Sequence, residues 1–114
     1  MNHLSAEIQG CIRDCLDCHS SCYGMAMTHC LDSGGEHVAP AHFRTMMACA
    51  EICATAARFM MMNSPHHGDI CRECAAICRE CAADCERLDG MQACVDACRR
   101  CAESCEKMAA APRH

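Results

Sequence analysis

Fifteen of the 16 cysteines in this 114-residue chain recur at the spacing of one face of a helix. The clearest stretch is 71–85, where five cysteines follow one another at steps of 3, 4, 3 and 4. Such steps form a stripe that normally carries leucine, isoleucine or valine, because apolar burial drives helix packing. Cysteine differs from these residues in that its thiolate binds soft metal ions. The spacing therefore predicts a helix whose buried face consists of metal ligands.

Three other segments repeat this spacing. The cysteines expected on inner helix faces are Cys11, Cys15, Cys18, Cys22, Cys49, Cys53, Cys71, Cys74, Cys78, Cys81, Cys85, Cys94, Cys98, Cys101 and Cys105. Cysteines one turn apart have Cβ atoms about 5–6 Å apart, so two sulfurs can flank one ion at bonds of about 2.3 Å. Repetition in four segments predicts metal bound in bulk. Cys30 is a further candidate ligand, but it lies about 80° around the helix from Cys22 and is not assigned to the inner face.

Four helices are needed to carry these cysteines. We expect them at about 5–32, 40–63, 67–88 and 91–110. Ser5 is a potential N-cap, Gly34 follows the first helix and Pro40 begins the second. Short connections favour antiparallel neighbours. The predicted fold is an all-α, antiparallel up-down-up-down four-helix bundle with a cysteine-lined core, formed by residues 1–114 as one domain with a frayed tail at 112–114.

Charge balance favours Cu(I) as the bound ion. Zinc on four thiolates, or a four-iron cluster, would leave about −2 per site, and a column of such sites would bury several uncompensated charges. Cu(I) with bridging thiolates approaches one positive charge per sulfur, so a full core is nearly neutral at about one copper per cysteine. The empty core can stay neutral as protonated thiols, so each Cu(I) should release about one proton.

Antiparallel geometry brings the ends of the first and third helices beside the starts of the second and fourth. The residues gathered there are Met25, His29, Cys30, His42, Met46, Leu88 and Met91. Methionine binds Cu(I) but is also a common core filler, and for each histidine a solvated side chain is as reasonable as ligation. We expect this end to be a copper port. The opposite end, expected to be plugged, gathers Leu4, Ile8, Met60, His67 and Met108.

Charge and hydropathy exclude several classes of protein. The net charge of −5 comes from interspersed acidic and basic residues, so there is no basic patch for nucleic acid or anionic membranes. The N-terminus does not resemble a signal peptide, and no apolar run approaches the roughly 18 residues of a membrane span. We therefore expect a cytoplasmic protein with free thiols. Bridged Cα atoms lie about 4.4–6.8 Å apart, less than the spacing of about 8–10 Å between packed helix axes, which argues against disulfides.

Two additional apolar rows lie on the first two helices. The first row is Ile12, Leu16, Tyr23 and Met27, and the second is Phe43, Met47, Ala50, Ala54, Ala57 and Met61. More apolar surface than one bundle core requires indicates a subunit contact. For the second row, burial within the monomer is an equally good interpretation.

The cysteine pattern of essentially the whole chain resembles that of the four-helix-bundle copper storage proteins, a cysteine-rich, ferritin-like family. The matching motifs are Cys11-x3-Cys15-x2-Cys18-x3-Cys22, Cys49-x3-Cys53, the run 71–85 and Cys94-x3-Cys98-x2-Cys101-x3-Cys105. The resemblance implies the cytosolic branch: a homotetramer that stores many Cu(I) ions, loads them through one end and has no catalytic turnover. A copper chaperone is a candidate donor. The chain departs from a fully cysteine-lined pattern at Ala56 and Met60.

Other classes of function stay open. An iron–sulfur or zinc protein would also need many cysteines, although the residues between the cysteines of 71–85 are helix formers rather than the loop residues of cluster-binding runs. A thiol redox protein would need one exposed cysteine pair of low pKa, usually at a helix N-terminus. The cysteines here lie in the middle of the expected helices.

Overall fold

The computed structural model describes residues 3–111, so the tail expected at 112–114 lies outside the described residues. The long helices are α1 (Ala6–Met25), α3 (Pro40–Met61), α4 (His67–Glu86) and α5 (Gln92–Ala110). A π-helical turn, Ala26–Cys30, joins α1 to the short α2 (Leu31–Ser33), and a 3-10 helix, Gly35–Val38, leads to α3. The predicted fold class, an all-α four-helix bundle with a cysteine-lined core, is confirmed.

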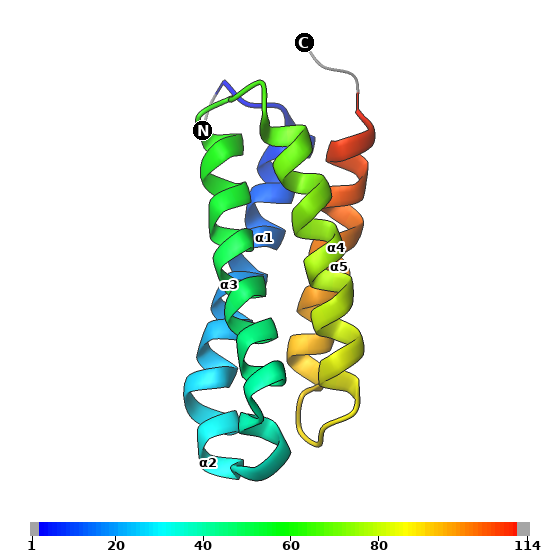
Figure 1. The fold of residues 1–114 in the computed structure, drawn as a ribbon. Coiled ribbons are helices and arrows are strands. Elements are labelled where there is room, and N and C mark those ends of the chain that lie inside the picture. The colour runs from blue at the N-terminus through cyan, green and yellow to red at the C-terminus, as the bar shows by residue number, and fades with distance from the viewer. Residues whose placement is uncertain (1–2, 112–114) are drawn as a thin grey trace.

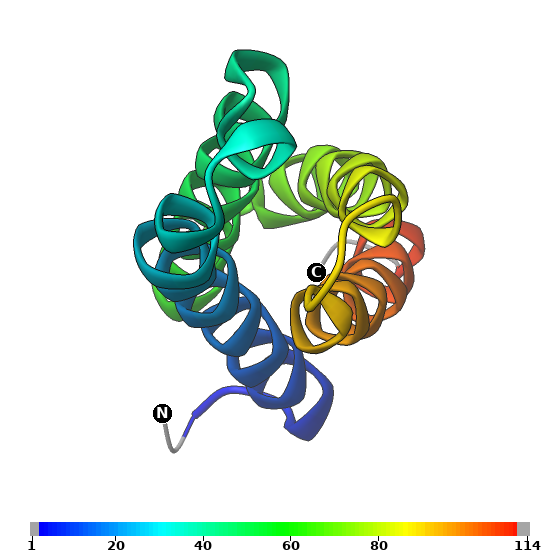
Figure 2. The ribbon, with the colours of Figure 1, turned by 90° about the horizontal axis from the view of Figure 1, so that it is seen from below.

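Successive long helices run in opposite directions along a rod that measures 47 × 22 × 18 Å (Figure 1). The lower end in this view contains α2, the 3-10 helix, the start of α3 and the turn between α4 and α5. The upper end contains the starts of α1 and α4 and the ends of α3 and α5. Figure 2, seen from the lower end, shows the four long helices around one axis. Cysteines that face this axis from different helices are thereby brought together.

Local sequence signals explain where the helices begin and end. The Ser5 side chain accepts a hydrogen bond from the backbone N–H of Ile8 at 3.2 Å, which caps α1. Gly34 follows α2 with φ +67°, a conformation that favours glycine, and Pro40 occupies the first turn of α3. Among the described residues, no helix is long and apolar enough to cross a membrane.

The π-helical turn brings Cys30 into the core. In a regular α-helix Cys30 would lie about 80° around the helix from Cys22, so regular helical spacing does not place it on the inner face. A π-helical turn takes up one extra residue and rotates the following chain backwards by most of that angle. Cys30 is fully buried as a result. A helix of constant pitch is therefore the wrong description of this segment.

The alanines of α3 allow this helix to pack closely against neighbouring helices of the same chain. Ala50, Ala54 and Ala57 are buried, and Nδ1 of His19, on α1, donates a hydrogen bond to the carbonyl of Ala50 at 2.8 Å. Of the two interpretations of this apolar row, a subunit contact or burial within the monomer, burial within the monomer applies to its central alanines. Ile12, from the row on α1, is also buried in the core.

Candidate metal centre

All 16 cysteines are buried, and their sulfurs form a continuous column along the bundle. Sγ–Sγ distances between contacting cysteines run from 3.3 Å for Cys22 and Cys94 to 4.0 Å for Cys74 and Cys101. A disulfide bond is only about 2.05 Å long, and no disulfide joins any of the cysteines among residues 3–111. The 15 cysteines expected on inner faces all lie in this column, and Cys30 joins them at its lower end.

The sulfurs are grouped so that neighbouring groups share members. Groups whose sulfurs all lie within 4.8 Å of one another include Cys15/Cys74/Cys101/Cys105, Cys53/Cys74/Cys78/Cys101, Cys18/Cys49/Cys53/Cys78, Cys18/Cys22/Cys49/Cys98 and Cys22/Cys81/Cys94/Cys98. With bonds of about 2.3 Å, two sulfurs on one ion lie about 3.8 Å apart in tetrahedral and about 4.6 Å apart in linear coordination. The observed spacing therefore suits metal binding with small side-chain movements, and shared sulfurs can bridge adjacent ions.

Burial and hydrogen bonding control the protonation of the thiols. Burial raises the pKa of the Cys30 thiol, and repulsion from Cys94 and Cys81 raises it further. Hydrogen bonding with Cys18 raises the pKa of Cys22, whereas hydrogen bonding with Cys22 lowers the pKa of Cys94 to about 5. An unperturbed thiol has a pKa of about 8.5. Thiols with a raised pKa are protonated at neutral pH, so a metal ion must displace a proton from each of them.

A mixed group of ligands lies at the lower end of the column. Sγ of Cys30 lies 3.8 Å from Nε2 of His42, 3.7 Å from Sδ of Met46 and 3.8 Å from Sδ of Met91. His42 is only 2% exposed, and both methionines are buried. These four residues are among those that were expected, from the sequence, to lie at this end of the bundle. We call Cys30, His42, Met46 and Met91 the lower cluster.

Asp84 fixes the orientation of the His42 ring. Its carboxylate lies 2.6 Å from Nδ1 of His42. Partial burial raises the pKa of Asp84, but hydrogen bonds from His42 and Arg87 outweigh this effect and hold the pKa below its ordinary value. Because an ionised carboxylate only accepts hydrogen bonds, Nδ1 of His42 donates to it, and Nε2 faces Sγ of Cys30. A carboxylate behind a histidine is typical of metal-binding imidazoles.

The other predicted ligands of this end lie outside the lower cluster. Nε2 of His29 and Nε2 of His37 each donate a hydrogen bond to the carbonyl of Asp89 at 2.9 Å. Gly90 follows with φ +78°, and a Cβ atom there would lie 2.7 Å from the His29 ring. His29 is thus held against the turn between α4 and α5. Met25 is half-buried and packs against the core.

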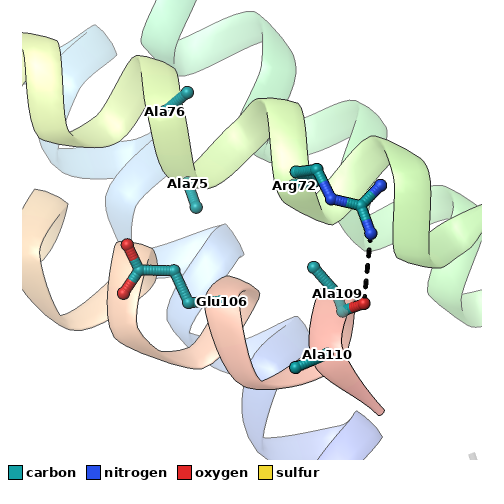
Figure 3. Close-up of a pocket in the computed structure, with 6 residues that line it drawn as sticks. All are labelled: Arg72, Ala75, Ala76, Glu106, Ala109 and Ala110. Atoms are coloured by element: carbon teal, nitrogen blue, oxygen red, sulfur yellow. Dashed lines mark hydrogen bonds between the residues drawn. The ribbon is translucent and has the colours of Figure 1, made fainter. Parts of the chain in front are cut away.

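A surface hollow that reached this column would be a path for an ion. One hollow, with a volume of about 480 Å³, lies between α4 and α5. Figure 3 shows its alanine floor and Arg72, whose guanidinium donates a hydrogen bond to the carbonyl of Ala109 at 3.3 Å. The lining residues are Arg72, Ala75, Ala76, Glu106, Ala109 and Ala110, none of which carries sulfur or imidazole. This hollow is therefore a groove in the surface rather than a path to the thiols.

The chain is similar to a known protein family and to several solved structures. The model of the family described as copper storage protein matches residues 4–110. A solved structure of the protein Nmul_A1745 from Nitrosospira multiformis is 52% identical, covers 91% of this chain and 95% of that one, and superimposes with a TM-score of 0.90. The Cu(I)-bound copper storage protein BsCsp3 is 39% identical, covers 91% and 99% of the two chains, and has a TM-score of 0.83.

Two further similarities come from Bacillus subtilis. The apo form of copper storage protein 3 is 40% identical, covers 90% of this chain and 98% of that one, and has a TM-score of 0.79. An uncharacterized cysteine-rich protein, YhjQ, of strain 168 is 39% identical over 69 residues. That alignment spans 60% of this chain and 63% of the relative.

Proposed function

The chain belongs to the copper storage protein family, and on that premise we propose that it stores many Cu(I) ions on the thiolates of its core. The observation that carries this proposal is the set of four-sulfur groups that share members along the bundle. Shared sulfurs suit Cu(I), because bridging thiolates keep the charge of a filled column close to zero. Isolated tetrathiolate sites would instead accumulate negative charge in the core.

We assign the storage ligands to the 15 cysteines of the inner faces, with Cys30 and its neighbours as the outermost sites. On this assignment a full chain holds about one Cu(I) per cysteine. No catalytic step is needed for storage, so the protein is proposed to act without turnover. Buried thiols persist in a reducing compartment, which supports the cytoplasm as its location.

The first test is an anaerobic titration of the metal-free chain with Cu(I) against a competing chelator. We expect uptake of about one Cu(I) per cysteine before free copper accumulates. Metal analysis of the protein purified from cells supplemented with copper, iron or zinc is the matched control for metal identity. Saturation at one or two ions per chain would rule out storage, and bound iron with visible absorbance would favour an iron–sulfur protein.

The lower end is proposed to be the copper port. Its imidazole and thioether ligands bind Cu(I) less tightly than thiolates do, so they can pass ions to the column without trapping them. The lower cluster supports this role because Cys30 contacts both kinds of ligand. His29 and His37 lie at the same end, where each donates a hydrogen bond to the carbonyl of Asp89 in the turn between α4 and α5.

Removing the port histidines should change the rate of loading. We expect His29→Ala combined with His42→Ala to slow Cu(I) uptake in stopped-flow mixing, because the first ligands that an arriving ion meets are lost. Final capacity should not change, since the thiol column is intact. His66→Ala, an exposed histidine at the upper end, is the control. Unchanged kinetics in the double variant would refute the port assignment.

A homotetramer assembled through α1 and α3 is the proposed oligomeric state. Leu16 on α1, Met27 in the π-helical turn and Met61 on α3 stay exposed in the monomer, which is unfavourable for large apolar side chains in water. A copper chaperone remains the proposed donor of metal.

A further inference from the structure

The upper end of the bundle contains a histidine nitrogen with no hydrogen-bond partner. Nδ1 of His67, the first residue of α4, is buried, and nothing among the residues 3–111 forms a hydrogen bond with it. Burying a polar atom without a partner is unfavourable, so such an atom is often explained by a ligand that binds there. From its sequence pattern, this end was expected to be plugged, and His67 was not among the residues assigned to the copper port.

His67 lies directly above the last layer of thiols. It precedes Cys71 by four residues on α4, so the two side chains share one face with Cβ atoms about 5–6 Å apart. The Cys71 thiol lies near enough to those of Cys105 and Cys11 to interact with them, and the sulfurs of Cys11 and Cys105 are 3.8 Å apart. Three thiols from three helices therefore end the column one helical turn below the imidazole.

Met108 supplies a second metal-binding side chain at this level. It follows Cys105 by three residues on α5 and is 8% exposed. Together with His67 and Ile8 it lines a surface hollow of about 370 Å³. Glu7 and Lys107 lie at the same hollow and carry opposite charges, so their charges do not bar a cation from it. The hollow thus opens from solvent onto an imidazole and a thioether, one helical turn from the last three thiols.

We propose that His67 and Cys71 bind a terminal Cu(I) ion at the upper end, with Met108 beside it, so that the column exchanges metal at both ends. This inference rests on the proposed function. The donor set, one imidazole and one thioether next to thiols, is similar in kind to that of the lower cluster at the other end of the column, which has one imidazole and two thioethers beside Cys30. Such mixed ligands bind Cu(I) and leave it more exchangeable than a site built from thiolates alone.

The test is an anaerobic Cu(I) titration of the unmodified chain, followed through the imidazole nitrogens by ¹⁵N NMR. We expect the Nδ1 signal of His67 to shift to a metal-bound position by saturation, while the signals of the exposed neighbour His66 stay unchanged. At saturation, His67→Ala should hold about one Cu(I) less per chain than His66→Ala. The NMR measurement needs no variant, so it decides the question even if His67→Ala folds poorly.

The outcomes separate the two proposals. Uptake of Cu(I) in bulk with an unshifted His67 Nδ1 and equal capacities for both variants would overturn the terminal site and leave storage intact. Saturation at one or two ions per chain would overturn storage, and the terminal site with it. A shifted Nδ1 together with the loss of one ion in His67→Ala establishes the second end as a metal site.

Discussion

Saturating the metal-free chain with Cu(I) is expected to raise its melting temperature by several tens of degrees. The reason is that each four-sulfur group draws its cysteines from several helices, so a bound ion links these helices. One such group combines two cysteines of α1 with one of α3 and one of α5: Cys18, Cys22, Cys49 and Cys98. A ligand that binds only the folded state stabilises it by about 2.7 kcal/mol when present at about 100 times its dissociation constant. Three such sites contribute about 8 kcal/mol, which is comparable with the entire free energy of unfolding of a small domain.

The expected shift follows from the size of the chain. A stabilisation of 1 kcal/mol raises the melting temperature of a domain of this size by about 4–8 °C. Thiols of the unfolded chain also bind copper, which reduces the effect. They cannot reproduce groups drawn from three helices, however, so a large net stabilisation should remain. Circular dichroism under anaerobic conditions, with and without Cu(I), measures the shift directly.

A matched variant shows whether the core causes this stabilisation. Cys18→Ala, Cys49→Ala and Cys98→Ala together remove three sulfurs that belong to one group and leave the outer surface unchanged. We expect Cu(I) to raise the melting temperature of this variant, relative to its own metal-free form, clearly less than it raises that of the original chain. Equal melting temperatures for the loaded and metal-free forms of the original chain would mean that copper binds outside the bundle core.

The thiol column could be predicted from the sequence because helical periodicity alone determines which side chains share a face. Cysteine at positions such as 74, 78 and 81 can point to one axis only if the segment is a helix packed on others. The pattern was repeated four times, so errors of one or two residues at helix ends did not matter. What periodicity cannot detect is a local change of pitch, and the π-helical turn that buries Cys30 is such a change.

The environment of His42 was not predictable in the same way. Its partner Asp84 lies 42 residues away in sequence, and the position of that carboxylate depends on how α3 and α4 are aligned along the bundle axis. One signal was present: Asp84 immediately precedes Cys85, the last thiol of its helix, and so lies near the lower end. Similarly, the carbonyl of Asp89, which binds His29 and His37, belongs to the backbone and leaves no trace in the side-chain pattern.

Ala50 and its neighbours show why small residues alone do not identify an oligomer interface. A row of alanines lets any helix approach closely, whether it belongs to the same chain or to another. In this bundle the alanines are buried within the chain, and the apolar side chains of Tyr23 on α1 and Met27 in the π-helical turn remain exposed. Burial in the folded monomer is the property that distinguishes the two cases.

Lowering the pH is expected to weaken Cu(I) binding by up to about tenfold per ion and pH unit. Burial raises the pKa of Cys30, and hydrogen bonding with Cys18 raises that of Cys22. A thiol with a raised pKa holds its proton at neutral pH, so each ion bound must release one. As the pH falls, the released proton is returned more readily and the equilibrium moves toward the empty core. As the pH rises above the thiol pKa, this dependence disappears.

Counting protons during loading tests the same linkage more directly. In weakly buffered solution at pH 7, at most about one proton should appear per Cu(I), since thiols with a lowered pKa have already lost theirs. Cys94, with a pKa of about 5 through its hydrogen bond with Cys22, belongs to this group.

A competing chelator with known proton binding then gives the Cu(I) affinity at pH 6, 7 and 8. Loading without proton release, and with the same affinity at all three values, would mean that the empty core holds thiolates. Burying so many unpaired negative charges contradicts the charge argument that selects Cu(I), so this result would also require another explanation for the choice of metal.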